Sequence, residues 1–129
     1  MNFLLDTHSL IWYFIGSRRL KSEAREAIDG CRVMGGKLLV PTIVLSEALD
    51  IAEKGKVEFD FEEMYRLIRE DPSFEITGFT PEIFDETIRV EGIKEIHDRI
   101  ISATARFYGV GVITRDRIIK DSGEVALLE

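Results

Sequence analysis

Asn2-Phe3-Leu4-Leu5-Asp6-Thr7-His8 opens the chain with a short apolar run that ends in a carboxylate. An uninterrupted apolar run of this length predicts a β-strand buried on both faces, as in a parallel sheet. An acid directly after such a strand lies where open α/β sheets bind their ligands, beyond the carboxyl ends of the strands. Asp6 is therefore a candidate functional residue, although it could also simply cap the helix that the pattern predicts from Thr7 onward.

Strand patterns alternate with helical patterns along the chain, which predicts an α/β fold with a mostly parallel central sheet. We expect strands at about residues 2–6, 37–40, 74–79, 110–114 and 125–128. We expect helices at about 7–16, 22–31, 42–55, 59–70, 81–90 and 98–108, and a short helical turn at 116–120. Thr42 and Thr80 are expected to cap their helices. Because no repeat or linker interrupts the pattern, we expect one domain over residues 1–129.

Composition narrows the class of protein. Hydrophobic residues make up 45% of the chain and the longest apolar stretch is broken by Pro41, so no membrane segment is expected. The single cysteine, Cys31, allows no internal disulfide, which favours a reducing cytoplasm.

The charge balance bears on nucleic-acid binding. With 17 Lys and Arg against 24 Asp and Glu the net charge is −7, which argues against non-specific coating of DNA or RNA. A local basic rim is compatible with this balance, and its candidates are Arg18, Arg19, Lys21, Arg99, Arg106, Arg115, Arg117 and Lys120.

Three further acids occupy positions comparable to that of Asp6. Glu47 falls in an apolar helical row with Ile43 and Ile51, where a carboxylate is costly to bury unless it is paired or binds a metal. Asp98 precedes an apolar helical pattern, and Asp116 follows an apolar strand pattern. Taken singly, each has an ordinary explanation as an exposed, capping or turn residue. Taken together, they predict carboxylates that converge at one edge of the sheet.

Converging carboxylates repel one another unless a cation holds them. Hard ions such as Mg²⁺ and Mn²⁺ prefer oxygen ligands, and they support hydrolysis of phosphodiesters. The sequence offers no rival chemistry, since it has no glycine-rich phosphate loop and its serines lack a nucleophile-elbow setting. His8 and His97 are isolated and are assigned packing or surface roles, although His97 is kept in reserve as the neighbour of Asp98. Trp12 and Phe14 are assigned to the core.

Four segments resemble the PIN domain, and most closely the VapC-type toxin ribonucleases of toxin–antitoxin pairs. These segments, which occur in the family's order and spacing, are Leu4-Leu5-Asp6-Thr7-His8, Leu45-Ser46-Glu47-Ala48, His97-Asp98-Arg99-Ile100-Ile101-Ser102-Ala103-Thr104-Ala105 and Ile113-Thr114-Arg115-Asp116.

The resemblance implies a three-layer α/β/α sandwich and a Mg²⁺- or Mn²⁺-dependent endoribonuclease. By position, the catalytic and metal-binding set is Asp6, Glu47, Asp98 and Asp116. Thr7 and Thr114 match polar positions beside the metal, and Asp121 is a supplementary candidate without a secure counterpart. The resemblance also implies an RNA substrate, a cognate antitoxin protein and a homodimer.

Three alternatives stay open at this point. The chain could be a catalytically silent PIN-like module whose acids attract a basic partner. It could be a receiver-type signalling domain, although the strand pattern ending at Phe79-Thr80 lacks the Asp that such domains phosphorylate. A phosphotransferase with a strand-end Asp would place a second acid two residues after Asp6, where this chain has His8.

Overall fold

The computed structural model describes residues 1–115 and 127–128. Its strands are β1 (Phe3–Leu5), β2 (Leu38–Pro41), β3 (Phe74–Thr77), β4 (Gly111–Ile113) and β5 (Leu127–Leu128). Its helices are α1 (Thr7–Ile15), α2 (Ser22–Val33), α3 (Thr42–Glu53), α4 (Phe61–Glu70), α5 (Pro81–Arg89) and α6 (Ile96–Tyr108). The predicted turn at 116–120 and the beginning of the last predicted strand lie outside the described residues.

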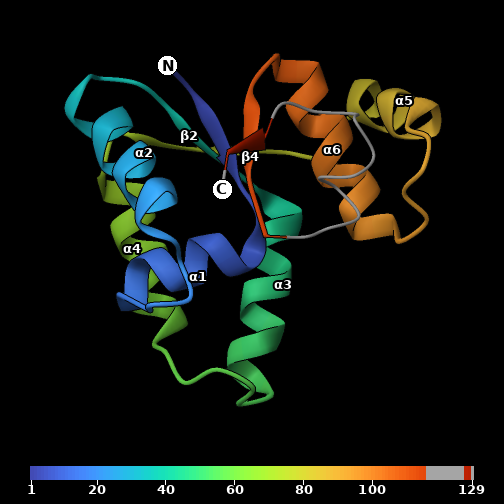
Figure 1. Ribbon diagram of the computed structural model, residues 1–129. Helices are drawn as coiled ribbons and strands as arrows, with labels where there is room; N and C mark the ends of the chain where they lie inside the picture. Colours follow the sequence, from blue (N-terminus) through green and yellow to red (C-terminus); the bar gives the residue numbers. More distant parts are fainter. Residues whose placement is uncertain (116–126, 129) are drawn as a thin grey trace.

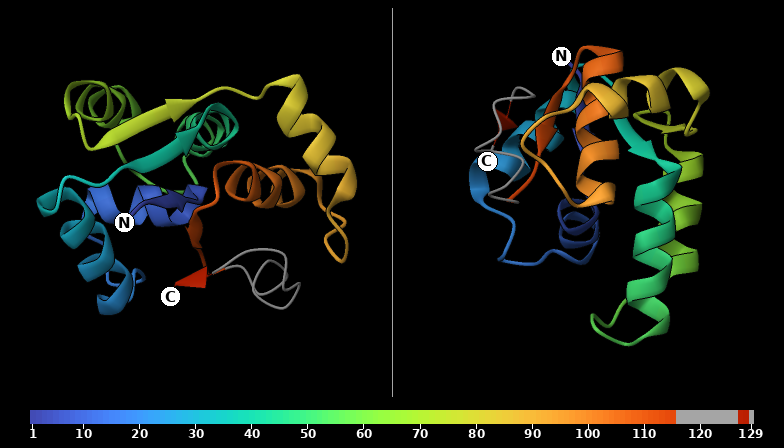
Figure 2. Two further views of the ribbon diagram at one scale, coloured as in Figure 1. Left: turned by 90° about the horizontal axis from the view of Figure 1, so that it is seen from above. Right: turned by 90° about the vertical axis from the view of Figure 1, so that its right-hand side faces the viewer.

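The five strands form one parallel sheet in the order β3-β2-β1-β4-β5. Figure 1 shows α1, α2 and α4 on one side of the strands, α5 and α6 on the other, and α3 below them. In Figure 2, α3 extends past the rest of the molecule and α5 lies outermost against α6. The fold is the expected three-layer α/β/α sandwich.

The sheet is buried because its strands are almost purely apolar. Leu4 and Leu5 of β1, Leu38 of β2 and Val112 of β4 are completely buried. Burial of such side chains is the main favourable contribution to folding. Among the described residues no helix is both long and apolar enough to cross a membrane.

Three helix starts differ from the sequence prediction. Helix α4 begins at Phe61, two residues later than expected, with Asp60 as its cap. Thr42 is the first residue of α3 rather than its cap, and Pro41 stands at the cap position without a side-chain hydrogen bond. Helix α6 begins at Ile96, two residues before Asp98, because the Glu95 carboxylate caps it by accepting hydrogen bonds from the amides of His97 and Asp98. Thr80 caps α5 as expected, accepting a hydrogen bond from the Ile83 amide.

Gly36 leads into β2 where there is no room for a side chain. A Cβ at this position would lie 2.2 Å from the Met1 carbonyl oxygen and 2.7 Å from Cys31 Sγ. We therefore expect Gly36→Ala to lower the free energy of unfolding by about 1–3 kcal/mol, as overpacking does. Gly30→Ala is the matched control, since Gly30 lies inside α2, a Cβ there would meet nothing within 4 Å, and alanine favours the helix. Urea denaturation of both variants checks this, and equal stability of the two would contradict it.

Candidate active site

Asp6 is placed by the junction between β1 and α1. Its Oδ1 accepts a hydrogen bond of 2.9 Å from the Ser9 amide, which caps α1. Its Oδ2 accepts a hydrogen bond from the hydroxyl of Thr114, the residue after β4. The two residues are neighbours because Leu5 pairs with Ile113 in the parallel register. Asp6 can therefore cap α1 and serve in a functional site at the same time.

Burial makes the Asp6 carboxylate unusual. Only 8% of the residue is exposed to solvent. Burial raises the pKa of this carboxyl above its ordinary value, and the hydrogen bonds from Thr114 and Ser9 oppose that rise only in part. A desolvated carboxylate of this kind gains stability from a bound cation.

Glu47 lies on α3, one turn and a half after the end of β2, and is half-buried. Its Oε1 accepts a hydrogen bond of 2.5 Å from the hydroxyl of Thr7, the first residue of α1. Thr7 itself is buried. Each of the two predicted threonines thus donates a hydrogen bond to one of the predicted acids: Thr7 to Glu47, and Thr114 to Asp6. These bonds connect α1, α3 and the end of β4 at this edge of the sheet.

Asp98 comes from the first turn of α6. The cap residue Glu95 lies beside it, and His97 Nδ1 is 3.3 Å from Glu95 Oε2. Partial burial alone would raise the pKa of Glu95, but the hydrogen bonds from the amides of His97 and Asp98 outweigh it, so that its pKa lies below the ordinary value. Glu95 is therefore ionised at neutral pH.

One cavity of about 350 Å³ brings these residues together. Its lining residues are Asp6, Thr7, His8, Trp12, Glu47, Glu95, Asp98, Ile101 and Arg115. Three of the four predicted acids thus share a cavity, although they come from parts of the chain that are far apart in sequence. The fourth, Asp116, and the supplementary candidate Asp121 lie outside the described residues.

The donor set suits a hard cation, but within residues 1–115 no three His, Cys, Asp or Glu side chains are close enough to form a complete metal centre. Asp116, the predicted fourth ligand, lies outside residues 1–115 and is not part of that statement. A metal ion would fit this cavity because the carboxylates of Asp6, Glu47 and Asp98 line it, and oxygen atoms are the ligands that hard cations prefer. The carboxylate of Asp6 is also desolvated.

Several cavity residues were not predicted as site residues. Glu95 was missed altogether; its only signal is its position just before the helical pattern of α6. His8 was assigned a packing or surface role, and Trp12 was assigned to the core. Trp12 does pack against the core, but it is only half-buried and also lines the cavity.

The predicted basic rim is only partly present. Arg115 lines the cavity, whereas Arg99 donates to the carbonyl oxygens of Thr87 and Val90 at the end of α5. Arg106 forms an ion pair with Glu86, with 3.6 Å between Nε and Oε2. Arg99 and Arg106 therefore connect α6 to α5. Arg117 and Lys120 lie outside the described residues.

Two other cavities are less suited to hold a cation. One of about 640 Å³ is mostly apolar and lies around Met1, Cys31 and Met34. Another of about 470 Å³ also contains acids, but each of them has a partner: Asp71 pairs with Arg32 at 2.6 Å, Glu70 pairs with Arg66, and Asp29 accepts a hydrogen bond from Tyr13. The smaller acidic cavity is therefore the best candidate for chemistry.

The comparisons with known proteins agree with the resemblance. The chain has 14% identity and a TM-score of 0.76 to a VapBC2 structure from Rickettsia felis bound to a promoter DNA fragment, covering 99% of this chain and 98% of that one. It has 22% identity and a TM-score of 0.66 to a toxin–antitoxin complex from Klebsiella pneumoniae, covering 98% and 95%. For FitAcB from Neisseria gonorrhoeae the identity is 18%, the TM-score 0.66 and the coverage 98% and 96%. Among curated proteins no sequence matches this chain significantly. The PIN domain family model matches residues 3–124, and the chain therefore belongs to the PIN domain family.

Proposed function

We propose that this chain is a metal-dependent endoribonuclease that hydrolyses RNA phosphodiester bonds as the toxin of a toxin–antitoxin pair. PIN domains are generally nucleases. The observation that carries the proposal is the single cavity lined by Asp6, Glu47 and Asp98, which come from the end of β1, from α3 and from α6. Acids gathered from three elements into one partly desolvated cavity are typical of a cation site.

In this proposal Asp6, Glu47 and Asp98, with Asp116, hold Mg²⁺ or Mn²⁺. When bound, such an ion supplies Lewis-acid charge to the phosphodiester and makes a coordinated water more acidic. Thr7 and Thr114 orient the carboxylates of Glu47 and Asp6 through their hydroxyl groups. We assign Asp121 only a supplementary role.

We further propose that a cognate antitoxin protein binds this chain, that the chain forms a homodimer, and that it acts as a single domain in the cytoplasm. Similar folds in toxin–antitoxin complexes support the antitoxin partner. The free thiol of Cys31 suits a reducing compartment.

The experiment that tests the nuclease is RNA cleavage by the purified protein with Mg²⁺ or Mn²⁺. We expect cleavage that EDTA abolishes and that Asp98→Asn lowers by about 10³-fold, as expected when transition-state charge stabilisation worth about 4 kcal/mol is lost. Asp85→Asn, an exposed acid on α5, is the matched control and should keep full activity. Cleavage that persists in EDTA or in Asp98→Asn would remove the proposed site.

A catalytically silent binding module remains the second candidate. The net charge of −7 favours it, because an acidic surface suits a basic partner. A calorimetric titration with Mn²⁺ discriminates between the two: the nuclease requires binding that Asp98→Asn weakens, whereas the silent module predicts none.

A further inference from the structure

One wall of the acidic cavity is formed by a cluster of rings and a guanidinium. The His8 ring lies against the Trp12 indole, with 5.5 Å between centroids and 34° between planes. The Arg115 guanidinium carbon lies 5.8 Å from the centre of the same indole. All three residues line the cavity that contains Asp6 and Asp98. We call His8, Trp12 and Arg115 the ring wall.

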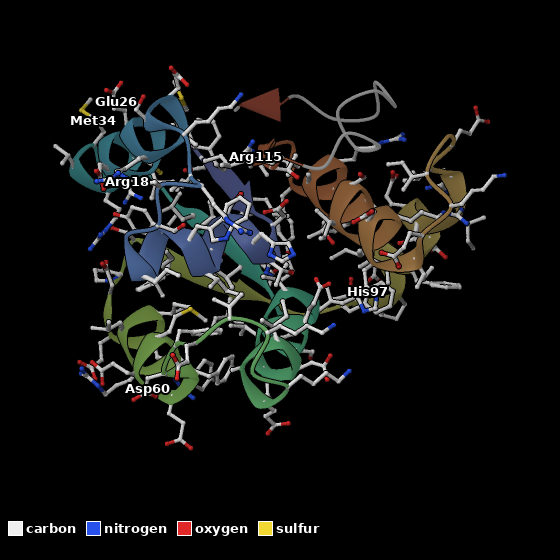
Figure 3. All side chains as sticks on the ribbon, turned by 60° about the horizontal axis from the view of Figure 1, so that its bottom comes forward. Arg18, Glu26, Met34, Asp60, His97 and Arg115 are labelled. Atoms are coloured by element: carbon white, nitrogen blue, oxygen red, sulfur yellow. The ribbon has the colours of Figure 1, made fainter. Side chains whose placement is uncertain are left out.

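Arg115 is held in place from a distant part of the chain. Its Nη1 donates a 2.6 Å hydrogen bond to the carbonyl oxygen of Arg19, in the loop between α1 and α2. A guanidinium carries five N–H donors, so this bond uses one of them. Figure 3 shows Arg115 beside α1, apart from His97 at the start of α6. The side chain is exposed, and so is His8.

The accessibility of these rings is what sets the ring wall apart from the core. Phe14, two residues further along α1, packs its ring against Phe74 at 5.5 Å and lines a different cavity. Trp12 is half-buried and lines the acidic cavity, a position that fixes its orientation and leaves part of it accessible. A fixed, accessible aromatic surface beside an arginine is the usual platform on which bases of single-stranded nucleic acid stack.

A stacking platform would help this protein to bind RNA despite its negative net charge. A net charge of −7 opposes RNA binding, and the cavity itself is lined by acids. Stacking is sequence-tolerant, and it adds binding energy beyond that gained from neutralising phosphates. A base held on the ring wall would place its phosphate near the carboxylates without requiring a broad basic surface.

We propose that the ring wall is the subsite for a base of single-stranded RNA next to the scissile phosphate. His8 and Trp12 provide the stacking surface, and Arg115 pairs with a phosphate. This inference rests on the proposed nuclease function and adds to it the residues that select single-stranded substrate.

Trp12 reports on the test directly, because it is the sole tryptophan of the chain. Its fluorescence is followed as single-stranded RNA is added to the Asp98→Asn protein, in which cleavage is suppressed. A second titration uses an oligonucleotide of equal length with abasic sites, which keeps the phosphates and lacks the bases. We expect quenching by the RNA and little by the abasic strand.

Variants then separate the ring wall from general surface effects. In the same background, His8→Ala, which removes a stacking partner, and Arg115→Ala, which removes a phosphate partner, should each weaken RNA binding about tenfold. Arg69→Ala is the matched control, because Arg69 lies 5.6 Å over the Tyr65 ring on α4, away from the cavity. Fluorescence anisotropy of labelled RNA measures these affinities without depending on tryptophan. With Asp98 intact, His8→Ala should raise KM for RNA cleavage and leave kcat nearly unchanged.

The outcomes distinguish the subsite from the nuclease. Equal quenching by the abasic strand, or equal affinities of Arg115→Ala and Arg69→Ala, would overturn the subsite even if the protein cleaves RNA. Quenching by a basic peptide but not by RNA would also overturn it. Quenching that requires bases in a protein that cleaves no RNA would support the subsite and contradict the nuclease.

Discussion

Asp6→Asn should abolish RNA cleavage and at the same time stabilise the protein in the absence of metal. Activity should fall by about 10³-fold, because the substitution removes a carboxylate from the proposed cation site. The fold should survive, since an asparagine oxygen can still accept the hydrogen bond from the Ser9 amide and is a good helix cap. The amide nitrogen would then face the Thr114 hydroxyl, whose oxygen can accept a hydrogen bond.

The gain in stability follows from the sign of the pKa shift. Burial raises the pKa of Asp6 in the folded protein above its ordinary value of 3.8. The folded state therefore binds the proton more tightly than the unfolded state, and the free energy of unfolding falls as pH rises from 3.8 through the folded pKa. In EDTA near neutral pH, Asp6→Asn should thus melt a few degrees above the wild type. Below pH 3.8 the two should converge, because Asp6 is then protonated in both states.

Asp71→Asn is the matched control for this pair of effects. The hydrogen bonds that Asp71 accepts from Ser73 and Arg32 outweigh its desolvation and lower its pKa. Its removal should lower the melting temperature slightly, because the ion pair with Arg32 is partly exposed, and should leave cleavage unchanged. Thermal melts followed by circular dichroism, with and without Mg²⁺, measure all three proteins. If Asp6→Asn melts at a lower temperature than the wild type in EDTA near neutral pH, then burial does not destabilise the ionised Asp6 carboxylate in the absence of a metal ion.

The sequence allowed the position of Asp6 to be predicted because the relevant pattern is local. A short apolar run followed by Asp6 defines both a buried strand and its carboxyl end, and the parallel register then places Thr114 beside it. Glu47 was predicted from the pattern of its own helix, where it falls in an apolar row with Ile43 and Ile51. In both cases the signal lies in the pattern of residues close by in the sequence.

Residues fixed by long-range contacts were harder to predict. Nothing local distinguishes Arg99, which caps the end of α5, from Arg115, which lines the cavity and contacts Arg19. Glu95 was missed because the start of α6 was placed at Asp98, so the capping carboxylate fell into the preceding loop. The arginines show that periodicity does not reveal a partner from another element, and Glu95 shows that it does not fix the exact start of a helix.

Thr7→Val should lower RNA cleavage about 10–100-fold, the range found when outer-shell partners of metal ligands are removed. Thr7 donates its hydroxyl hydrogen to Glu47 Oε1 at 2.5 Å and so fixes the direction of that carboxylate. Valine has nearly the same shape, and Glu47 is only half-buried, so water can replace the lost hydrogen bond. We therefore expect little change in stability, and a loss of activity that follows from the misplaced carboxylate.

Two further variants make this expectation specific to the hydroxyl group. Thr7→Ser keeps the donor and should retain most of the activity. Thr87→Val removes a buried hydroxyl that donates to the Ile83 carbonyl oxygen within α5, so it should leave cleavage unchanged. Cleavage rates over a range of Mg²⁺ concentrations separate the causes: a higher Mg²⁺ requirement in Thr7→Val, but not in Thr87→Val, places the loss at the Glu47 carboxylate. If Thr7→Val cleaves RNA like the wild type at every Mg²⁺ concentration, Glu47 does not depend on Thr7 for its position in the site.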